Sequence, residues 1–442
     1  MRHNVLFVAL DTMRADHLSC YGYPKQTTPN IDGLAERGRL FRNFFSVGNC
    51  THPGFTAMLT GLFPETSRVV SHWTSIPLAE GVPTLAQCFA DAGYQTAAID
   101  NLYDAWVPKG YPYYPWFRRG YQYYAYPEHE AWYKPAQSVT DKAIEWLRTA
   151  PEGPFFLFVH YWQPHGPYNK APERFYRFYG GDDPCDPRLD FMPPRTRSIV
   201  HKLFGRPVTD PSYVIAAYDA EVAYADHALG TLLDALAHQG LLDETTVLVT
   251  ADHGEIMWPP RLAVGRPWCF GHIGLCDDCL RLPLIIADPD IQPGVVVENT
   301  QLVDVLPTLA EWCDLQAPPH LDGHSLAPAL IGGPIPSRDP VFASENTYQK
   351  QRALRTSRWK YTRMEEQLAS MPRRFLFDLR EDPLETVNLA DERPDTANEL
   401  DALMEAHIQA VTHGGKDPIL EQPVTERQWP RAKAPDHAAA ED

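Results

Sequence analysis

The sequence predicts an α/β protein in which a largely parallel central sheet is covered by helices on both faces. Residues 5–10, 155–161 and 246–250 form short, almost continuous apolar runs, which is the pattern of strands buried on both sides. Two segments have helical character instead: 84–93 closes on a glycine, and 213–238 repeats apolar residues at helical spacing. A smaller α+β part is expected towards the C-terminus.

The 442 residues have room for a large core and two or three domains. The formal net charge of -18 argues against a basic, nucleic-acid-binding surface. No apolar run has membrane-spanning length, and the run after Asn4 is too short for a signal peptide. We therefore expect a cytoplasmic protein without nucleic-acid or membrane partners, whose eight cysteines are reduced.

Polar residues follow two of the predicted strands directly. Asp11 ends the first apolar run, and Asp252-His253-Gly254 follows the strand 246–250. Ligands of α/β sheets bind at the carboxyl ends of strands, and neighbouring Asp and His side chains suit metal coordination. An isolated Asp in such a place is otherwise an ordinary turn residue.

Thr51 lies at the predicted start of a helix. Asn49 or Thr51 can cap this helix, and Pro53 suits its first turn. A hydroxyl in this position meets free N–H groups and the positive end of the helix dipole, which favour an anion. The segment alone leaves two interpretations open: Thr51 is a capping residue, or it is a nucleophile.

Several motifs, in order along the chain from residue 4 to about 410, resemble the sulfatase family of the alkaline phosphatase superfamily. They are Leu10-Asp11-Thr12-Met13-Arg14-Ala15-Asp16, Thr51-His52-Pro53 followed by Leu59-Thr60-Gly61, Pro164-His165-Gly166-Pro167-Tyr168 and Ala251-Asp252-His253-Gly254. The resemblance implies an alkaline-phosphatase-like sheet. It also implies that Asp11, Asp252, His253 and the Thr51 oxygen hold a metal. Thr12, where the family often has a second Asp, is a weak ligand at best.

The nucleophile motif departs from the family pattern. Sulfatases carry a Cys or Ser at the position of Thr51, and they carry an Arg where this chain has Phe55. Cys50 is one place off the required spacing, so its conversion to formylglycine is not expected. The resemblance instead implies that Thr51 is the nucleophile, as Thr is in other branches of the superfamily.

The remaining anchors are inferred from the same resemblance. Asn101 stands at the position of a family Lys, and Tyr103 stands at that of a His, so both are candidates for substrate binding. His165 corresponds to the His beside the leaving oxygen, and His272 to a sulfate-binding Lys. Phe55, Asn101 and His272 together imply less positive charge, which favours a substrate with one negative charge.

The sequence thus predicts a metal-dependent hydrolase of a small anionic ester. Thr51 attacks to give a covalent intermediate, and His165 or His272 stabilises the leaving oxygen. The cofactor is one divalent ion, Mn, Zn or Ca, with a dinuclear site as the competing arrangement. Phosphodiesters or phosphonate monoesters are the favoured substrates. A sulfatase that uses unmodified Thr and an inactive sulfatase-like binding protein are the alternatives.

We expect a catalytic domain at 1–335, a C-terminal subdomain with a small antiparallel sheet and a helix at 336–412, and a Pro-rich charged tail at 413–442. Residues 103–135 are dense in aromatic side chains and Pro. They fit a pocket wall, a lid, an oligomer contact or a surface loop packed on itself. Whether the protein forms a homo-oligomer is therefore left open.

Three further groups have mainly structural interpretations. Cys269, Cys276 and Cys279 could bind zinc, but no second matching pair is evident. His160 is expected to pack within its strand. Asp219 and Asp226 lie on the long helix and are expected to be structural.

Overall fold

The computed structural model describes residues 3–72, 76–101, 115–127, 135–149, 151, 153–262, 267–368 and 371–426. Its main sheet has the strand order β11-β2-β10-β6-β1-β5-β3-β4, with β9 paired to β2. The bounds are β1 Asn4–Leu10, β2 Arg39–Phe45, β3 Gln95–Ile99, β4 Tyr123–Ala125, β5 Phe155–Tyr161, β6 Thr245–Thr250, β9 Arg281–Leu282, β10 Leu284–Ala287 and β11 Gly294–Gln301.

The predicted parallel core of this sheet is confirmed. β1 lies between β5 and β6 and pairs in parallel with both, and β3 pairs in parallel with β5 and β4. Every residue of β1 is buried. β9 and β10 run antiparallel to their neighbours. Because β1, β5 and β6 point the same way, their carboxyl ends meet at one edge, where Asp11 and Asp252 follow.

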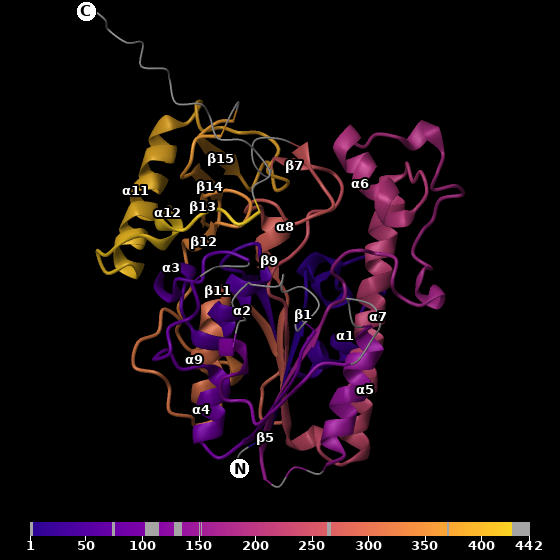
Figure 1. Ribbon diagram of the computed structural model, residues 1–442, viewed down its shortest axis with the longest axis vertical. Coiled ribbons are helices and arrows are strands. Elements are labelled where there is room, and N and C mark those ends of the chain that lie inside the picture. Colours follow the sequence, from indigo (N-terminus) through magenta and orange to yellow (C-terminus); the bar gives the residue numbers. More distant parts are fainter. Residues whose placement is uncertain are drawn as a thin grey trace, which may run out of the picture.

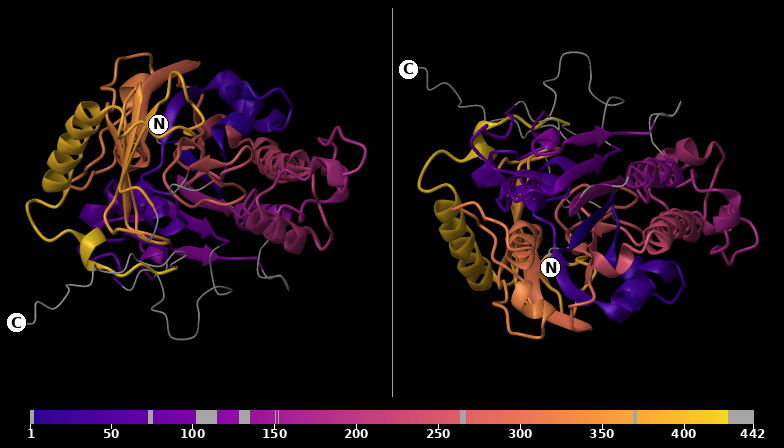
Figure 2. Two further views of the ribbon diagram at one scale, coloured as in Figure 1. Left: turned by 90° about the horizontal axis from the view of Figure 1, so that it is seen from above. Right: turned by 90° about the horizontal axis from the view of Figure 1, so that it is seen from below.

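Helices cover both faces of the sheet, as expected (Figure 1). One face carries α1 Pro29–Arg37, α5 Ala136–Leu147 and α7 Pro211–His238, and the other carries α2 Thr51–Thr60, α4 Leu85–Asp91 and α9 Val305–Trp312. Views along the perpendicular direction show the same separation (Figure 2). The shorter helices are α3 Pro64–Ser67, α6 Pro194–Phe204, α8 Asp277–Leu280 and α10 Ala327–Leu330.

The acidic residues of the long helix α7 are structural in the described chain. Asp219 accepts hydrogen bonds from Lys25 and Tyr23 and pairs with His17 at 2.8 Å. Asp226 accepts from the backbone N–H groups of Asn30 and Ile31 at the start of α1. These carboxylates therefore attach α7 to the segment that precedes α1 and to α1 itself.

The C-terminal part has the expected antiparallel sheet and helix. The sheet has the order β12-β13-β14-β15, and α11 packs against it (Figure 1). The bounds are β12 Val341–Glu345, β13 Gln351–Arg355, β14 Trp359–Met364, β15 Arg374–Asp378, α11 Pro394–Val411 and α12 Pro418–Glu421, while β7 Arg261–Leu262 and β8 Pro267–Trp268 form a separate hairpin. The division into domains at 335 and 412 stays a prediction.

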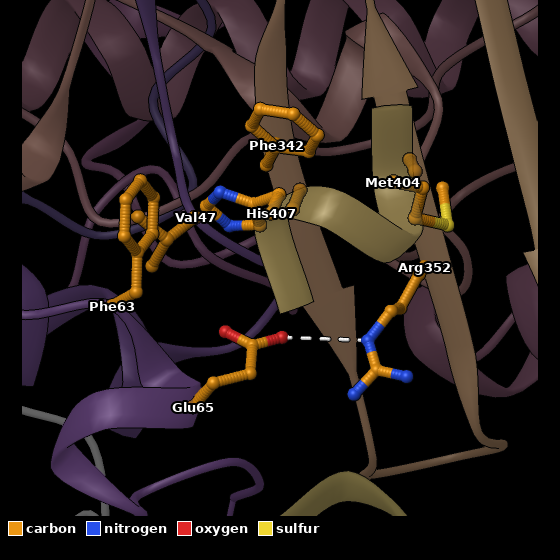
Figure 3. Close-up of a pocket in the computed structure, with 9 residues that line it drawn as sticks. Val47, Phe63, Glu65, Phe342, Arg352, Met404 and His407 are labelled. Carbon is orange, nitrogen blue, oxygen red and sulfur yellow. Dashed lines mark ion pairs between the residues drawn. The ribbon is translucent and has the colours of Figure 1, made fainter. Parts of the chain in front are cut away.

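A small pocket lies where the two parts meet (Figure 3). Val47, Phe63 and Glu65 come from the first part, Phe342 and Arg352 from the C-terminal sheet, and Met404 and His407 from α11. The Arg352 Nε atom lies 3.6 Å from Glu65 Oε1, and the guanidinium also pairs with Glu365 and Asp417. A network of charged side chains therefore joins α3 of the first part to β13 of the C-terminal sheet.

The cysteine cluster does not gather into a metal site. The Sγ atoms of Cys276 and Cys279 lie 3.9 Å apart, whereas Cys269 Sγ faces Thr196 Oγ1. All eight cysteines are free thiols. Across the described ranges, no helix has both the length and the apolar character needed to cross a membrane.

Candidate active site

Asp11 follows β1 in a strained turn at the edge of the sheet. Its backbone N–H donates to Tyr161 O on β5 at 3.0 Å. The next residue, Thr12, has φ near +60°, a conformation that Thr rarely adopts outside functional sites. This turn directs the Thr12 N–H towards Asp252 Oδ1 at 3.3 Å. The ends of β1 and β6 are therefore joined directly.

His253 points its Nε2 atom at the other candidate ligands. Its Nδ1 donates to the Gly254 carbonyl at 2.9 Å, which leaves Nε2 as the free nitrogen of the neutral ring. From Nε2 the distances are 3.5 Å to Asp252 Oδ2, 3.7 Å to Asp11 Oδ1 and 3.4 Å to Thr51 Oγ1. The structure therefore places the four expected ligands of the metal together.

The helix α2 positions Thr51 at this cluster. It begins at Thr51, and its cap is Cys50 rather than the expected Asn49 or Thr51. The physical reason is that the Asn49 amide is used elsewhere, donating to His272 O at 2.7 Å. Gly54 allows the close approach, because a Cβ there would lie 2.7 Å from the Asp252 carbonyl oxygen.

The donor set fits a divalent cation. One ligand atom each from Asp11, Asp252 and His253 lies within 4.8 Å of the others, and all three residues are buried. Both Asp11 carboxylate oxygens, Asp252 Oδ2 and Thr12 Oγ1 are buried without a hydrogen-bond partner among the described residues. Burial and the neighbouring carboxylates Asp252 and Glu255 raise the pKa of Asp11 well above its usual value. A bound cation would compensate this otherwise costly burial of negative charge.

The His272 ring lies between the rings of His165 and His253 in centroid distance, 5.3 Å from the first and 4.6 Å from the second, and the pKa values of His165 and His272 are shifted in opposite directions. His165 donates from Nδ1 to Gly166 O at 2.8 Å, and burial followed by the nearby His272 lowers its pKa to about 4. At His272, burial opposes the charge, but Glu255, 3.2 Å from Nδ1, outweighs it and raises the pKa. His272 is therefore the better proton donor of the two.

The C-terminal part contributes Tyr348 to this side of the site. The Tyr348 hydroxyl lies 3.4 Å from His272 Nε2, and Glu255 holds the opposite nitrogen of the same ring. Sequence reasoning identified neither Glu255 nor Tyr348 as a functional residue. Glu255 follows Asp252-His253-Gly254 directly, so its place in that motif was an available signal.

His160 was expected only to pack in its strand, yet it also faces the site. Its ring is buried, with Nδ1 2.8 Å from Asp100 Oδ1 and Nε2 3.8 Å from Asp11 Oδ2. The register explains this, because His160 is the β5 neighbour of Ala9 in β1. Side chains two residues apart along a strand point to the same face of the sheet, so Asp11 lies on the face of Ala9 and His160. Because every residue of β5 is buried, the sequence of this strand holds no alternation that would have indicated the role of His160.

The Phe55 ring packs among aromatic side chains next to His160. Its ring meets the His160 ring edge-on, with centroids 4.7 Å apart, and it also contacts Phe158 and Phe117. Asn101 is buried directly after Asp100, at the end of β3. Tyr103 lies outside the described residues, as does most of the aromatic segment 103–135 except 115–127 and Pro135.

Comparison with known proteins identifies the class that this fold and site define. The sulfatase family profile matches residues 3–315, and the profile described as N-sulphoglucosamine sulphohydrolase, C-terminal, matches residues 269–413. The chain belongs to the sulfatase family, in the alkaline phosphatase superfamily, and is a hydrolase of ester bonds. This family generally uses a divalent metal ion, which agrees with the candidate site of Asp11, Asp252 and His253.

Individual relatives include both sulfatases and a phosphonate hydrolase. Choline-sulfatase of Rhizobium meliloti is 25% identical over 82% of this chain and 77% of its own. Arylsulfatase A of Homo sapiens is 27% identical over 95% of this chain and 92% of its own. The crystal structure of the phosphonate monoester hydrolase of Agrobacterium radiobacter is similar with a TM-score of 0.74 and 25% identity, covering 92% and 96% of the two chains.

Proposed function

We propose that this protein hydrolyses a singly charged phosphodiester or phosphonate monoester through a covalent intermediate on Thr51. The observation that carries the proposal is the position of the Thr51 hydroxyl at the start of α2, 3.4 Å from His253 Nε2 and beside Asp11 and Asp252. A divalent cation held by Asp11, Asp252 and His253 would supply positive charge beside Thr51 and the substrate oxygens.

The residues of the chain perform the first step. Thr51 Oγ1 attacks phosphorus while its proton passes to water, and the bond between phosphorus and the alcohol oxygen breaks, so that the alcohol leaves with a proton donated by His272. The free N–H groups at the start of α2 favour the negative charge of the group being transferred. In the second step water attacks the same phosphorus atom and releases Thr51.

His272 is the proposed proton donor to the leaving oxygen. Glu255 holds its Nδ1 at 3.2 Å, and the raised pKa keeps more of the ring protonated. His165 donates its own Nδ1–H to a backbone carbonyl, so its neutral ring can only accept at Nε2. We therefore assign His165 to substrate orientation rather than to proton donation.

The preference for phosphorus esters follows from the residues near the nucleophile. An unmodified Thr51 lacks the carbonyl hydrate through which a formylglycine expels sulfate. Phe55, at the position of the family's Arg, is uncharged, so it adds no positive charge to the site. Its ring packs on Phe158 and His160. A sulfatase that uses unmodified Thr51 is the second candidate, because choline-sulfatase and arylsulfatase A are among the relatives. We also propose Mn, Zn or Ca as the ion.

Substitution of Thr51 tests the nucleophile. Thr51→Ala should lower kcat on aryl phosphodiesters and phosphonates by more than about a thousandfold, since the covalent step is lost. Thr51→Ser should retain part of the activity. Because Cys50 and not Thr51 is the helix cap, both variants should unfold at nearly the wild-type denaturant midpoint. Turnover by Thr51→Ala near the wild-type rate would contradict the mechanism.

Removal of ligands tests the metal centre. The double variant Asp252→Ala, His253→Ala should lose its divalent metal in elemental analysis, because only the Asp11 carboxylate of the three buried groups remains. A double variant at an exposed position pair, Asp243→Ala and Glu244→Ala, should bind as much metal as the wild type. Equal metal content in both double variants would disprove the ligand assignment.

A further inference from the structure

The segment after α11 returns to the catalytic part instead of leaving the molecule. Asp417 caps the short helix α12 and pairs with the buried Arg352 at 2.7 Å. The Leu420 carbonyl accepts from Lys350 Nζ at 2.7 Å. Residues 413–426 therefore pack on their own chain, although the sequence suggested a tail.

One side of this segment contacts the residues beside Thr51. Gln422 Nε2 donates to Arg68 O at 2.7 Å, and Thr425 Oγ1 donates to His72 O at the same distance. The His72 ring is stacked on the ring of His52 with centroids 4.3 Å apart. Thr425 therefore holds the backbone of a residue whose ring packs on His52, the residue that follows Thr51 in α2.

The other side contacts the loop that carries Tyr348. The Glu426 N–H donates to Thr347 O at 2.7 Å, and Asn346 Nδ2 donates to Pro423 O at 3.2 Å. Thr347 precedes Tyr348, whose hydroxyl is 3.4 Å from His272 Nε2. The segment 422–426 thus connects both sides of the Thr51 site.

The Glu426 side chain brings a negative charge to this place. After Glu255 and Asp252, its carboxylate is a further cause of the raised pKa of His272. It also adds to the effect of burial in raising the pKa of Tyr348 and of Cys50. The backbone bond from Glu426 to Thr347 independently places this residue beside the loop of Tyr348, whose hydroxyl lies 3.4 Å from His272 Nε2.

Building on the proposed function, we infer that residues 422–426 form one wall of the active site and that Glu426 selects the alcohol half of the ester. The alcohol group continues from the leaving oxygen beside His272 towards Tyr348 and Glu426. An anionic alcohol would meet a like charge there, whereas a neutral or cationic one would not. The substrate class is accordingly an ester with a neutral or cationic alcohol half.

Turnover of matched substrates tests this inference. The probes are phenyl methylphosphonate and its 4-carboxylate and 4-trimethylammonio derivatives. Wild-type kcat/KM should be highest for the cationic probe and lowest for the anionic one. Glu426→Gln should reduce the ratio of cationic to anionic kcat/KM by about threefold to thirtyfold, as for unit charges several Å apart in a partly exposed site. Glu244→Gln, exposed at the opposite end of β6, should leave the ratio unchanged.

Binding separates this inference from the proposed function. Benzenesulfonates with the same 4-carboxylate or 4-trimethylammonio groups should bind with the same charge preference, measured by calorimetry, and Glu426→Gln should reduce it. If no phosphonate is turned over but binding shows this change, the proposed function fails and the inference stands. If turnover occurs and Glu426→Gln alters neither ratio, the inference is overturned and the proposed function stands.

Discussion

Four imidazole rings around Thr51 are fixed in the same way. In each ring Nδ1 is held by an acceptor: Gly254 O for His253, Gly166 O for His165, Glu255 for His272 and Asp100 for His160. Each ring therefore turns its Nε2 atom towards the site, as metal-binding and proton-transferring histidines commonly do. Two of the acceptors are the carbonyls of the glycines that follow the histidines in sequence.

At this scale His160 is the residue whose role can be tested most directly. Its ring stands between the Asp100 and Asp11 carboxylates, so its loss would leave buried like charges facing each other. His160→Gln should weaken divalent metal binding by about 10- to 100-fold, measured by competition with a chelator. His227→Gln, on the exposed side of α7, should bind metal as the wild type does. Equal affinities for all three proteins would show that Asp11 does not depend on His160.

Among the elements, α2 determines where Thr51, the proposed nucleophile, lies. The helix is buried along its whole length, and Ser46 Oγ and Gly54 both approach the Asp252 backbone oxygen. The helix α2 and the loop that follows β6 and contains Asp252 therefore pack against each other as one unit. A shift of this helix would move Thr51 relative to Asp252 and His253.

Gly54→Ala tests this packing. Its Cβ would lie 2.7 Å from the Asp252 carbonyl oxygen, so the loop or the helix must move. We expect a loss of about 1–3 kcal/mol in the free energy of unfolding, together with weaker metal binding. Gly33→Ala on α1 has no atom within 4 Å and should instead stabilise by about 0.4–1 kcal/mol. Denaturant titrations of both variants give the comparison, and a neutral Gly54→Ala would argue against close packing.

Across the whole molecule, the C-terminal part completes the site. Tyr348 and the proposed wall 422–426 come from it, while the candidate metal ligands and Thr51 come from the ends and connections of the parallel sheet. The relative placement of the two parts therefore affects chemistry as well as stability. Arg352 lies at this junction with carboxylates from both sides (Figure 3).

Removing the Arg352 guanidinium should weaken the junction. Arg352→Ala leaves the buried Glu65 carboxylate without its cation and takes from Glu365 one of two, since Arg363 stays, so we expect a loss of about 3–5 kcal/mol in the free energy of unfolding. Arg188→Ala breaks the ion pair between the exposed Arg188 and Asp186 and should leave the free energy of unfolding unchanged. Unfolding followed by both fluorescence and circular dichroism measures the effect, and equal stability of the two variants would contradict it.

The sequence by itself determined the class of fold and the family, and it predicted the candidate metal ligands. Asp11, Asp252 and His253 were predicted as ligands because they come within three residues of the end of an apolar strand, and parallel strands of one sheet end at a common edge. Thr51 was found through motif spacing. Local patterns suffice here because the end of a strand and the start of a helix depend mainly on neighbouring residues.

Only the tertiary structure decided the partners that come from distant parts of the chain. His160 required the register of β5 against β1, Tyr348 required the docking of the C-terminal sheet, and Glu426 required the return of the C-terminal segment. None of these contacts is local in sequence. Each depends on how completed elements pack on one another, and the burial and electrostatic energies that fix such packing leave no periodic signal in the sequence.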